Sequence, residues 1–225
     1  MFYSKWTNLS GFQRTRGVLR TFALALRATA KWDSSPLIGP AVFLNAANQD
    51  ELSEAARELV TYAESDGDGG SRQAWTGILE MEFRHARQIQ LESVGLKSRE
   101  IEQAVMAVFL HSQPIGLSAK TRDLQVLVGP TRPDKIELEK GLTRWAQVSH
   151  WLDDTHTTAA VNGQLGSWRL GNRPNLTQMR AAAAKVISDD VVKARLLDEI
   201  AKVKALTAGA SALGIKVHTL PPKPK

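Results

Sequence analysis

Residues 134–170 read DKIELEKGLTRWAQVSHWLDDTHTTAAVNGQLGSWRL, and this stretch decides which fold the chain can adopt. Apolar residues in its first half recur at steps of three and four, so the sequence predicts a helix over 135–154. The Asn-Gly pair at 162–163 lies between two β-prone runs, 157–161 and 164–170. Asn-Gly between such runs is a strong sequence signal for a tight turn, so we predict a β-hairpin here.

The segment that precedes this stretch contains two more predicted helices. Ser98 is placed to cap a helix over 98–112, and a short helix follows over 118–128. Asp134, three residues before a glutamate, is placed to cap the third helix. A helix, a short helix, a longer helix and then a hairpin is the element order of a winged-helix domain. We therefore expect a winged-helix-like α+β module across 98–170.

Further helical patterns flank this module on both sides, so the predicted fold class is mainly α. The sequence predicts three segments: a basic helical segment over 1–65, a helix plus the winged-helix-like domain over 71–174, and a helical tail ending in a strand over 175–225. The other predicted elements are helices at 11–31, 50–63, 71–92, 176–187 and 191–207, an extended connector at 37–44, a flexible loop at 66–70 and a strand at 214–220.

Composition excludes several classes of site. The 225 residues include no cysteine, which excludes disulfides, thiol nucleophiles and cysteine-ligated metal centres and fits a reducing compartment. The sequence contains no apolar run of 18 residues, so we expect a cytoplasmic protein with no membrane partner. Neither a P-loop nor a Gly-x-Gly-x-x-Gly fingerprint is present, and no catalytic constellation was found. We expect no catalysis from this chain alone.

One pair of residues has a spacing that carboxylate-bridged metal sites use. Glu82 and His85 lie three positions apart (i, i+3) on the predicted helix over 71–92. Such metal sites need a second pair and further carboxylates on facing helices, and the sequence supplies only this one. A solvated helix face is therefore the favoured interpretation, and no metal site is predicted.

The net charge of +6 is concentrated at the start of the chain. Residues 1–31 contain six basic residues and no acidic ones, so they account for the whole excess. Arg14 and Arg16 lie near the start of the first predicted helix, where guanidinium groups and a helix N-terminus can hold an anion together. The alternative is an ordinary basic surface helix without a ligand.

The third helix of a winged-helix module is the one that enters a DNA groove. In this chain it carries Lys135, Lys140 and Arg144, which are the candidate contacts to DNA or to a partner protein. Acidic residues are interspersed among them, and each acid facing phosphate weakens DNA binding. Packing against a protein therefore fits the charge better than direct reading of DNA.

Four blocks of sequence resemble a known family. These are GFQRTRGVL (11–19), WDSSPLIGPAVFL (32–44), VFLHS (108–112) and WRLGNRPNLTQM (168–179). They resemble blocks in a family of large prokaryotic AAA+-like ATP-binding proteins encoded beside DNA methyltransferases in phage-defence or restriction-like loci. The resemblance implies a nucleotide-binding core with a phosphate loop, a helical lid and a winged-helix-like region, and this chain is similar to the part after the core.

The resemblance also implies roles for particular residues and partners. An arginine at the start of the lid helix reads the γ-phosphate of ATP in such proteins, and Arg14 and Arg16 both occupy a matching position. ATP and Mg²⁺ would be bound only together with the missing ATPase core, and DNA or a methyltransferase subunit would be the other partner. The implied function is that of a lid and winged-helix adaptor which relays the nucleotide state. The alternatives are a stand-alone winged-helix DNA-binding protein and a structural protein-interaction module.

Overall fold

The structure is a computed structural model that describes residues 15–32, 38–47, 49, 51–65, 75–112, 118–153, 166–171 and 173–202. It divides into two compact units, residues 1–179 and residues 180–225. The predicted loop at 66–70 and the predicted strand at 214–220 lie outside the described residues.

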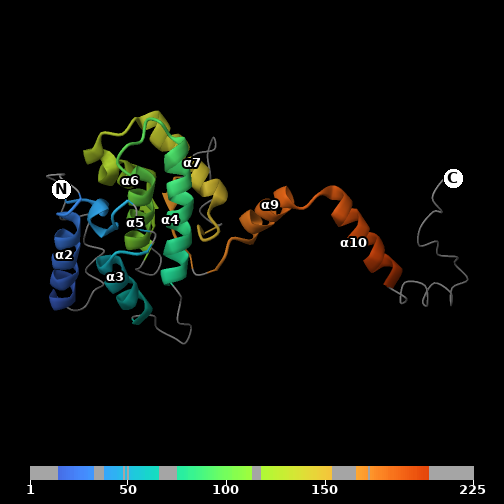
Figure 1. Ribbon diagram of the computed structural model, residues 1–225, viewed down its shortest axis with the longest axis horizontal. Coiled ribbons are helices and arrows are strands. Elements are labelled where there is room, and N and C mark those ends of the chain that lie inside the picture. The colour runs from blue at the N-terminus through green and yellow to red at the C-terminus, as the bar shows by residue number, and fades with distance from the viewer. Residues whose placement is uncertain are drawn as a thin grey trace, which may run out of the picture. The chain divides into compact units, whose positions relative to one another are not determined.

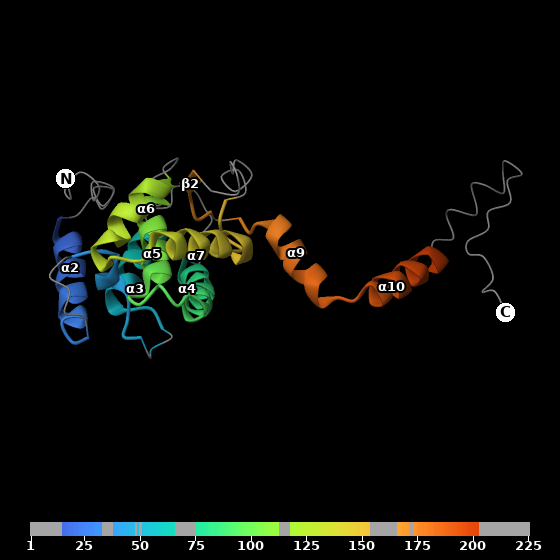
Figure 2. The same ribbon diagram turned by 90° about the horizontal axis from the view of Figure 1, so that it is seen from above.

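The described part of the chain is mainly helical, which confirms the predicted class at that level. In its described residues, the first unit contains the 3-10 helices η2 and η3 and the short strands β1 and β2 besides its α-helices; Figures 1 and 2 show how the α-helices are arranged. The bounds are α2 Thr15–Thr29, η2 Pro40–Phe43, α3 Glu54–Ser65, α4 Trp75–Glu92, α5 Glu100–Ser112, β1 Ala119–Lys120, α6 Thr121–Val128, η3 Gly129–Thr131, α7 Lys135–Val148, β2 Ser167–Trp168, α9 Leu176–Val186 and α10 Asp189–Lys202.

Helix α5 is the centre of the first unit. All of its residues are buried, and it lies between α2 and α4 in both views (Figures 1 and 2). It packs against α4, α6, α7 and η2. All residues of α5 from Ala104 to Leu110 are apolar, so the helix has apolar side chains around its whole circumference. Such a helix is stable only when neighbouring elements cover every side of it.

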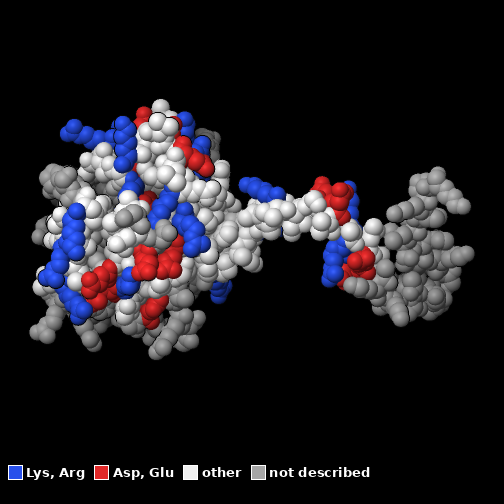
Figure 3. Space-filling view, in the orientation of Figure 1, with Lys and Arg blue, Asp and Glu red and all other residues white. Residues whose placement is uncertain are grey.

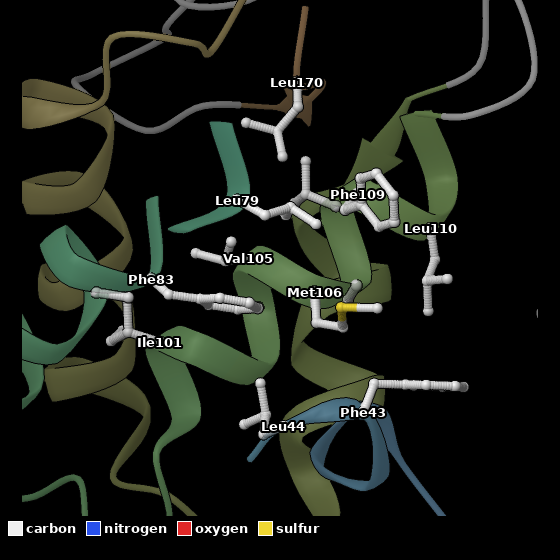
Figure 4. Packing of buried hydrophobic residues seen from close by; sticks show 14 of the residues in the cluster. Phe43, Leu44, Leu79, Phe83, Ile101, Val105, Met106, Phe109, Leu110 and Leu170 are labelled. Atoms are coloured by element: carbon white, nitrogen blue, oxygen red, sulfur yellow. The ribbon is translucent and has the colours of Figure 1, made fainter. Parts of the chain in front are cut away.

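The hydrophobic core joins residues that are distant in sequence. Figure 4 shows Phe43 from η2 and Leu170, two residues after β2, on opposite sides of Met106 and Phe109 in α5. Trp75 of α4 packs edge-on against Phe109, with 5.3 Å between the ring centroids. The predicted basic segment (1–65) and the predicted winged-helix-like segment (71–174) therefore contribute to one core.

Helix α2 lies at the surface of this unit. It buries Thr21, Ala25 and Thr29, and the Thr29 hydroxyl donates to the Val42 carbonyl oxygen at 3.0 Å. Its opposite side is exposed, and basic atoms follow it along the left edge of Figure 3. The predicted extended connector over 37–44 is wrong for its described part, because Pro40–Phe43 form the 3-10 helix η2.

The start of α5 differs from the prediction. Ser98 does not cap the helix; instead, the Glu100 carboxylate accepts from the backbone N–H groups of Lys97 and Ser98 at 3.3 and 2.9 Å. Arg99, directly before the helix, has a φ of 58°, which is in the left-handed region. The turn between α4 and α5 therefore depends on the left-handed backbone of Arg99 and on the Glu100 carboxylate, not on a serine cap.

The β-structure is organised around the segment 166–171. On one edge β1 pairs antiparallel with β2, placing Ala119 opposite Trp168, and the Thr121 N–H donates to the Gly166 carbonyl oxygen. On the other edge Leu152 pairs with Leu170, and the Asp153 N–H donates to the Arg169 carbonyl oxygen at 3.0 Å. Because successive peptide groups point to opposite edges, 166–171 lies between β1 and residues 151–153.

Two predicted helix bounds are corrected by this pairing. The helix predicted over 118–128 begins at Thr121, because Ala119 and Lys120 form β1. The helix predicted over 135–154 ends at Val148, and its last predicted residues pair with 169–171. The turn and the first strand of the predicted hairpin lie outside the described residues; in the described end of its second strand, Ser167 and Trp168 pair with Lys120 and Ala119, and Leu170 pairs with Leu152.

The predicted start of the third helix agrees with the structure, whereas the helix predicted over 50–63 begins at Glu54 and the helix predicted over 191–207 begins at Asp189. The Asp134 side chain accepts from the backbone N–H groups of Ile136 and Glu137 at 2.9 and 3.0 Å, so Asp134 caps α7 as predicted. Gly141 lets α7 approach α5 closely, because a Cβ atom there would lie 2.6 Å from Ile101 Cδ1.

Among the described helices, none is long and apolar enough to cross a membrane.

Candidate functional site

A buried carboxylate lies where α4 meets α7. Glu82 is 0% exposed and is a charged residue among apolar neighbours on the buried face of α4. Four donors surround it: the Trp145 indole N–H at 2.6 Å, the Ser149 hydroxyl at 2.9 Å, and the backbone N–H groups of His150 and Trp151. Buried polar groups are tolerated when such hydrogen bonds replace water.

The same residues turn the chain at the end of α7. Ser149 adopts an extended conformation, and its hydroxyl oxygen accepts from the Leu152 N–H at 3.1 Å while donating to Glu82. The Glu82 carboxylate binds the next two backbone N–H groups. The helix ends here because these donors bond to side chains instead of to α7 carbonyl groups.

Aromatic stacking extends this cluster to the sheet. The rings of Trp145 and Trp168 stack in parallel with 5.4 Å between their centroids, and the Trp168 indole N–H donates to the Thr121 hydroxyl at 2.9 Å. The Leu170 N–H donates to the Ser112 hydroxyl at 2.9 Å. The segment 166–171 is thus tied to α5, α6 and α7 by side-chain contacts.

The pKa values in the cluster are shifted by burial. Burial raises the pKa of the Glu82 carboxyl above its ordinary value, while the four hydrogen bonds act in the opposite direction. His85 lies one turn further along α4, and its ring meets that of His150 edge-on at 5.5 Å. Burial, followed by the charges of His150 and Arg84, lowers the pKa of His85. The neutral form of His85 is therefore favoured in the folded protein.

The predicted solvated face at Glu82 and His85 is wrong. Glu82 is fully buried, His85 is half-buried, and the Nδ1 atom of His85 has no hydrogen-bond partner among the described residues. No group of three or more His, Asp or Glu side chains in the described part of the chain is arranged to hold a metal ion. A carboxylate without exposed surface cannot reach a ligand, so Glu82 positions α7 and the turn after it.

The outward face of α7 carries the predicted contact residues. Lys135, Lys140 and Arg144 are all exposed, the last two being one turn apart on one face. Lys140 pairs with Glu137 at 3.0 Å, and Arg144 pairs across to Glu92 of α4 at 3.5 Å. The positive charge of this face is therefore largely balanced by the protein's own acids.

The structure leaves the predicted nucleotide-sensing pair without a described geometry. Arg14 lies outside the described residues, and Arg16 lies in α2 but its side chain is not described. Their role in reading a phosphate group stays a prediction. The exposed basic side chains that are described on and just after α2 are those of Arg20, Arg27 and Lys31.

Compared with protein-family models, with curated proteins and with solved structures, the chain matches none.

Sequence reasoning missed the central member of this site, although a signal for it was present. The buried positions of α4 include Ile78, Leu79, Phe83 and Ala86, and Glu82 lies inside that apolar stripe. An acidic residue within an apolar stripe is predicted to be buried and hydrogen-bonded, not solvated. The spacing of Glu82 and His85 resembles that of a metal site but carries no information about burial, whereas the apolar stripe does.

Proposed function

We propose that residues 100–171 form a winged-helix module and that this module works as a protein-binding adaptor. The observation that carries the proposal is the position of 166–171 between β1 and residues 151–153. In the chain order of a winged-helix module, the first strand comes between the first two helices. In its sheet, the last strand lies between the other two strands. The order of α5, β1, α6, α7, 151–153 and β2 fits that arrangement.

Charge favours a protein partner over DNA as the ligand of this module. Winged helices that bind DNA place cations on the third helix and the wing, where they replace the counterions of the phosphates. Residues 134–165, which cover α7 and the connection to β2, contain three basic and five acidic residues, a net charge of −2. Two of the three basic residues, Lys140 and Arg144, are already in ion pairs.

In the assembly that the family resemblance implies, the adaptor would respond to nucleotide. The basic segment before α3 would face an ATP-binding core, with Arg14 or Arg16 at the γ-phosphate, and the core would hold ATP and Mg²⁺. An arginine that contacts phosphate in one nucleotide state only gives the two states different free energies, which is sufficient to move a lid. The winged-helix module would pass this movement to a partner such as a methyltransferase subunit.

A DNA titration tests the choice of partner. We expect the full chain to show no salt-sensitive binding to duplex DNA between about 50 and 200 mM salt, the range over which phosphate contacts weaken strongly. The variant Lys140→Glu/Arg144→Glu is expected to behave like the wild type. Duplex binding at low salt that this double substitution abolishes would instead identify a DNA-binding protein.

A second experiment tests the response to nucleotide. In a protein that joins this chain to its ATP-binding core, Arg14→Ala and Arg16→Ala, singly and together, are expected to lower nucleotide affinity or ATP turnover. Arg57→Ala, which removes an exposed arginine of α3, serves as the matched control. Unchanged affinity and turnover in the double variant would leave a structural module without nucleotide sensing.

A further inference from the structure

The outward side of α2 has the pattern of a helix that pairs with another helix. Leu19, Ala23 and Leu26 of α2 and Ala30, the residue directly after the helix, are exposed and follow one another at steps of four, three and four residues. Leu19 is 66% and Leu26 is 43% exposed. Alternating steps of three and four keep apolar residues on one seam facing a partner helix. We call these four residues the α2 seam.

The charges beside the α2 seam lie on one flank. Arg20 follows Leu19 and Arg27 follows Leu26, so both guanidinium groups lie along the same side of the seam. Residues 1–32 contain no aspartate or glutamate, so α2 offers no acid of its own to neutralise them. Charges beside a helical seam choose the partner, because opposite charges attract and like charges repel across it.

One contact within the chain shows an arginine of this flank next to a carboxylate. The Arg20 Nε atom lies 3.4 Å from a carboxylate oxygen of Glu58 on α3. The Arg20 side chain is still 67% exposed, and an ion pair of this length at the surface contributes little. The flank therefore keeps its capacity to bind carboxylates from outside.

We propose that the α2 seam docks one helix of a partner protein, and that this partner helix carries Asp or Glu beside its apolar seam. A second copy of this chain fits poorly. In an antiparallel pair Arg20 and Arg27 would face their own counterparts, and in a parallel pair they would face the side of Phe22 and Thr29, which has no acid. A membrane surface fits poorly as well, since two leucines and two alanines offer a small apolar area. This proposal concerns α2 and does not depend on the function proposed for α7.

The test uses the full chain and two synthetic helical peptides of about four heptads, the length at which helices pair stably. Both carry leucine on the seam; one has glutamate and the other lysine at the flanking positions. We expect the acidic peptide to bind with a Kd roughly tenfold or more below that of the basic peptide, measured by fluorescence anisotropy. Equal binding of the two peptides, or binding of neither, would overturn the proposal.

Two sets of variants locate the site. Arg20→Glu/Arg27→Glu is expected to reverse the preference, so that the basic peptide binds more tightly. Arg84→Glu/Arg122→Glu, which makes the same change of net charge on exposed residues of α4 and α6, is expected to keep the wild-type preference. A wild-type preference in the first variant, or its loss in the second, would contradict docking at the α2 seam.

A third variant separates docking from simple charge attraction. Leu19→Ser/Leu26→Ser leaves both arginines in place and is expected to weaken binding of the acidic peptide by roughly tenfold, because two apolar side chains no longer leave water. Undiminished binding would show that no helix docks on the seam. Self-association of the chain, or attachment to vesicles containing phosphatidylserine, that Arg20→Glu/Arg27→Glu abolishes would assign the face to a second copy or a membrane and overturn the proposal.

Discussion

Among the three buried glutamates of the described residues, Glu82 on α4 and Glu102 on α5 are held in different ways. Glu82 of α4 receives hydrogen bonds from an indole, a hydroxyl and two backbone N–H groups, with no cation among them. Glu102 of α5 pairs with Arg87 of α4 at 2.9 Å and with Arg99 at 2.6 Å. One carboxylate is thus stabilised by neutral, directional donors and the other by two guanidinium groups.

The two glutamates also connect different parts of the chain. Glu82 fixes the end of α7 and the turn into residues 151–153, where the direction of the chain matters. Arg99 stacks over the ring of Trp32, three residues after the end of α2, at 5.4 Å, and it also donates to the Asn45 carbonyl oxygen. Charged groups thus connect α5 to α4 and, through Arg99, to the basic segment, whereas neutral donors connect the end of α7 to α4.

The largest expected effect is on the charged connection. Glu102→Gln removes the carboxylate that pairs with both Arg87 and Arg99, and breaking such a buried ion pair costs about 3 kcal/mol of unfolding free energy or more. Urea denaturation followed by circular dichroism measures this loss. A cost below that of the same substitution at Glu82 would contradict the contrast between the two sites.

Glu82→Gln is the matched substitution and is expected to cost less. It leaves no charge unpaired, but the new amide N–H₂ group faces donors, so about 1–2 kcal/mol of unfolding free energy is lost. Because the donors position the turn after α7, we also expect greater amide hydrogen exchange at residues 149–152 in this variant. Unchanged exchange there would show that Glu82 does not hold the turn.

The smallest expected effect is a dependence of stability on pH at His85. The folded state lowers the pKa of His85, so on acidification the unfolded chain takes up a proton before the folded protein does. The unfolding free energy therefore falls as the pH drops through about 6.5, the ordinary histidine value, towards the lower folded pKa. His85→Phe keeps a ring against His150 and is expected to flatten this part of the profile.

Glu82 changes the unfolding free energy with pH in the opposite direction to His85, so the two contributions must be measured separately. Its pKa is raised in the folded state, so the folded protein takes up a proton first and gains stability as the pH falls through that raised value. Repeating the titration in the Glu82→Gln background removes this contribution. An unchanged slope on adding His85→Phe to that background would exclude His85 as the source of the pH dependence.

Much of the helical architecture could be predicted from the sequence, since apolar periodicity is a local property. The stripe of α4 and the Asp134 cap of α7 are both visible in a few consecutive residues. The pairing of Ala119 with Trp168 is not, because a strand of two residues has no period of its own and depends on a distant partner. The same holds for the left-handed Arg99, whose turn is supported by contacts to Asn45, Trp32 and Glu102.

The most direct test of the proposed winged-helix arrangement is a cross-link between β1 and β2. Lys120 and Ser167 lie opposite each other, and the chain has no cysteine, so Lys120→Cys/Ser167→Cys introduces a single pair of thiols. Directly opposed residues of antiparallel strands are close enough for a disulfide. We expect this variant to form an intramolecular disulfide on mild oxidation, and Lys120→Cys/Gln147→Cys to form none. Failure of the first pair to cross-link in the folded protein would contradict the placement of 166–171 between β1 and residues 151–153.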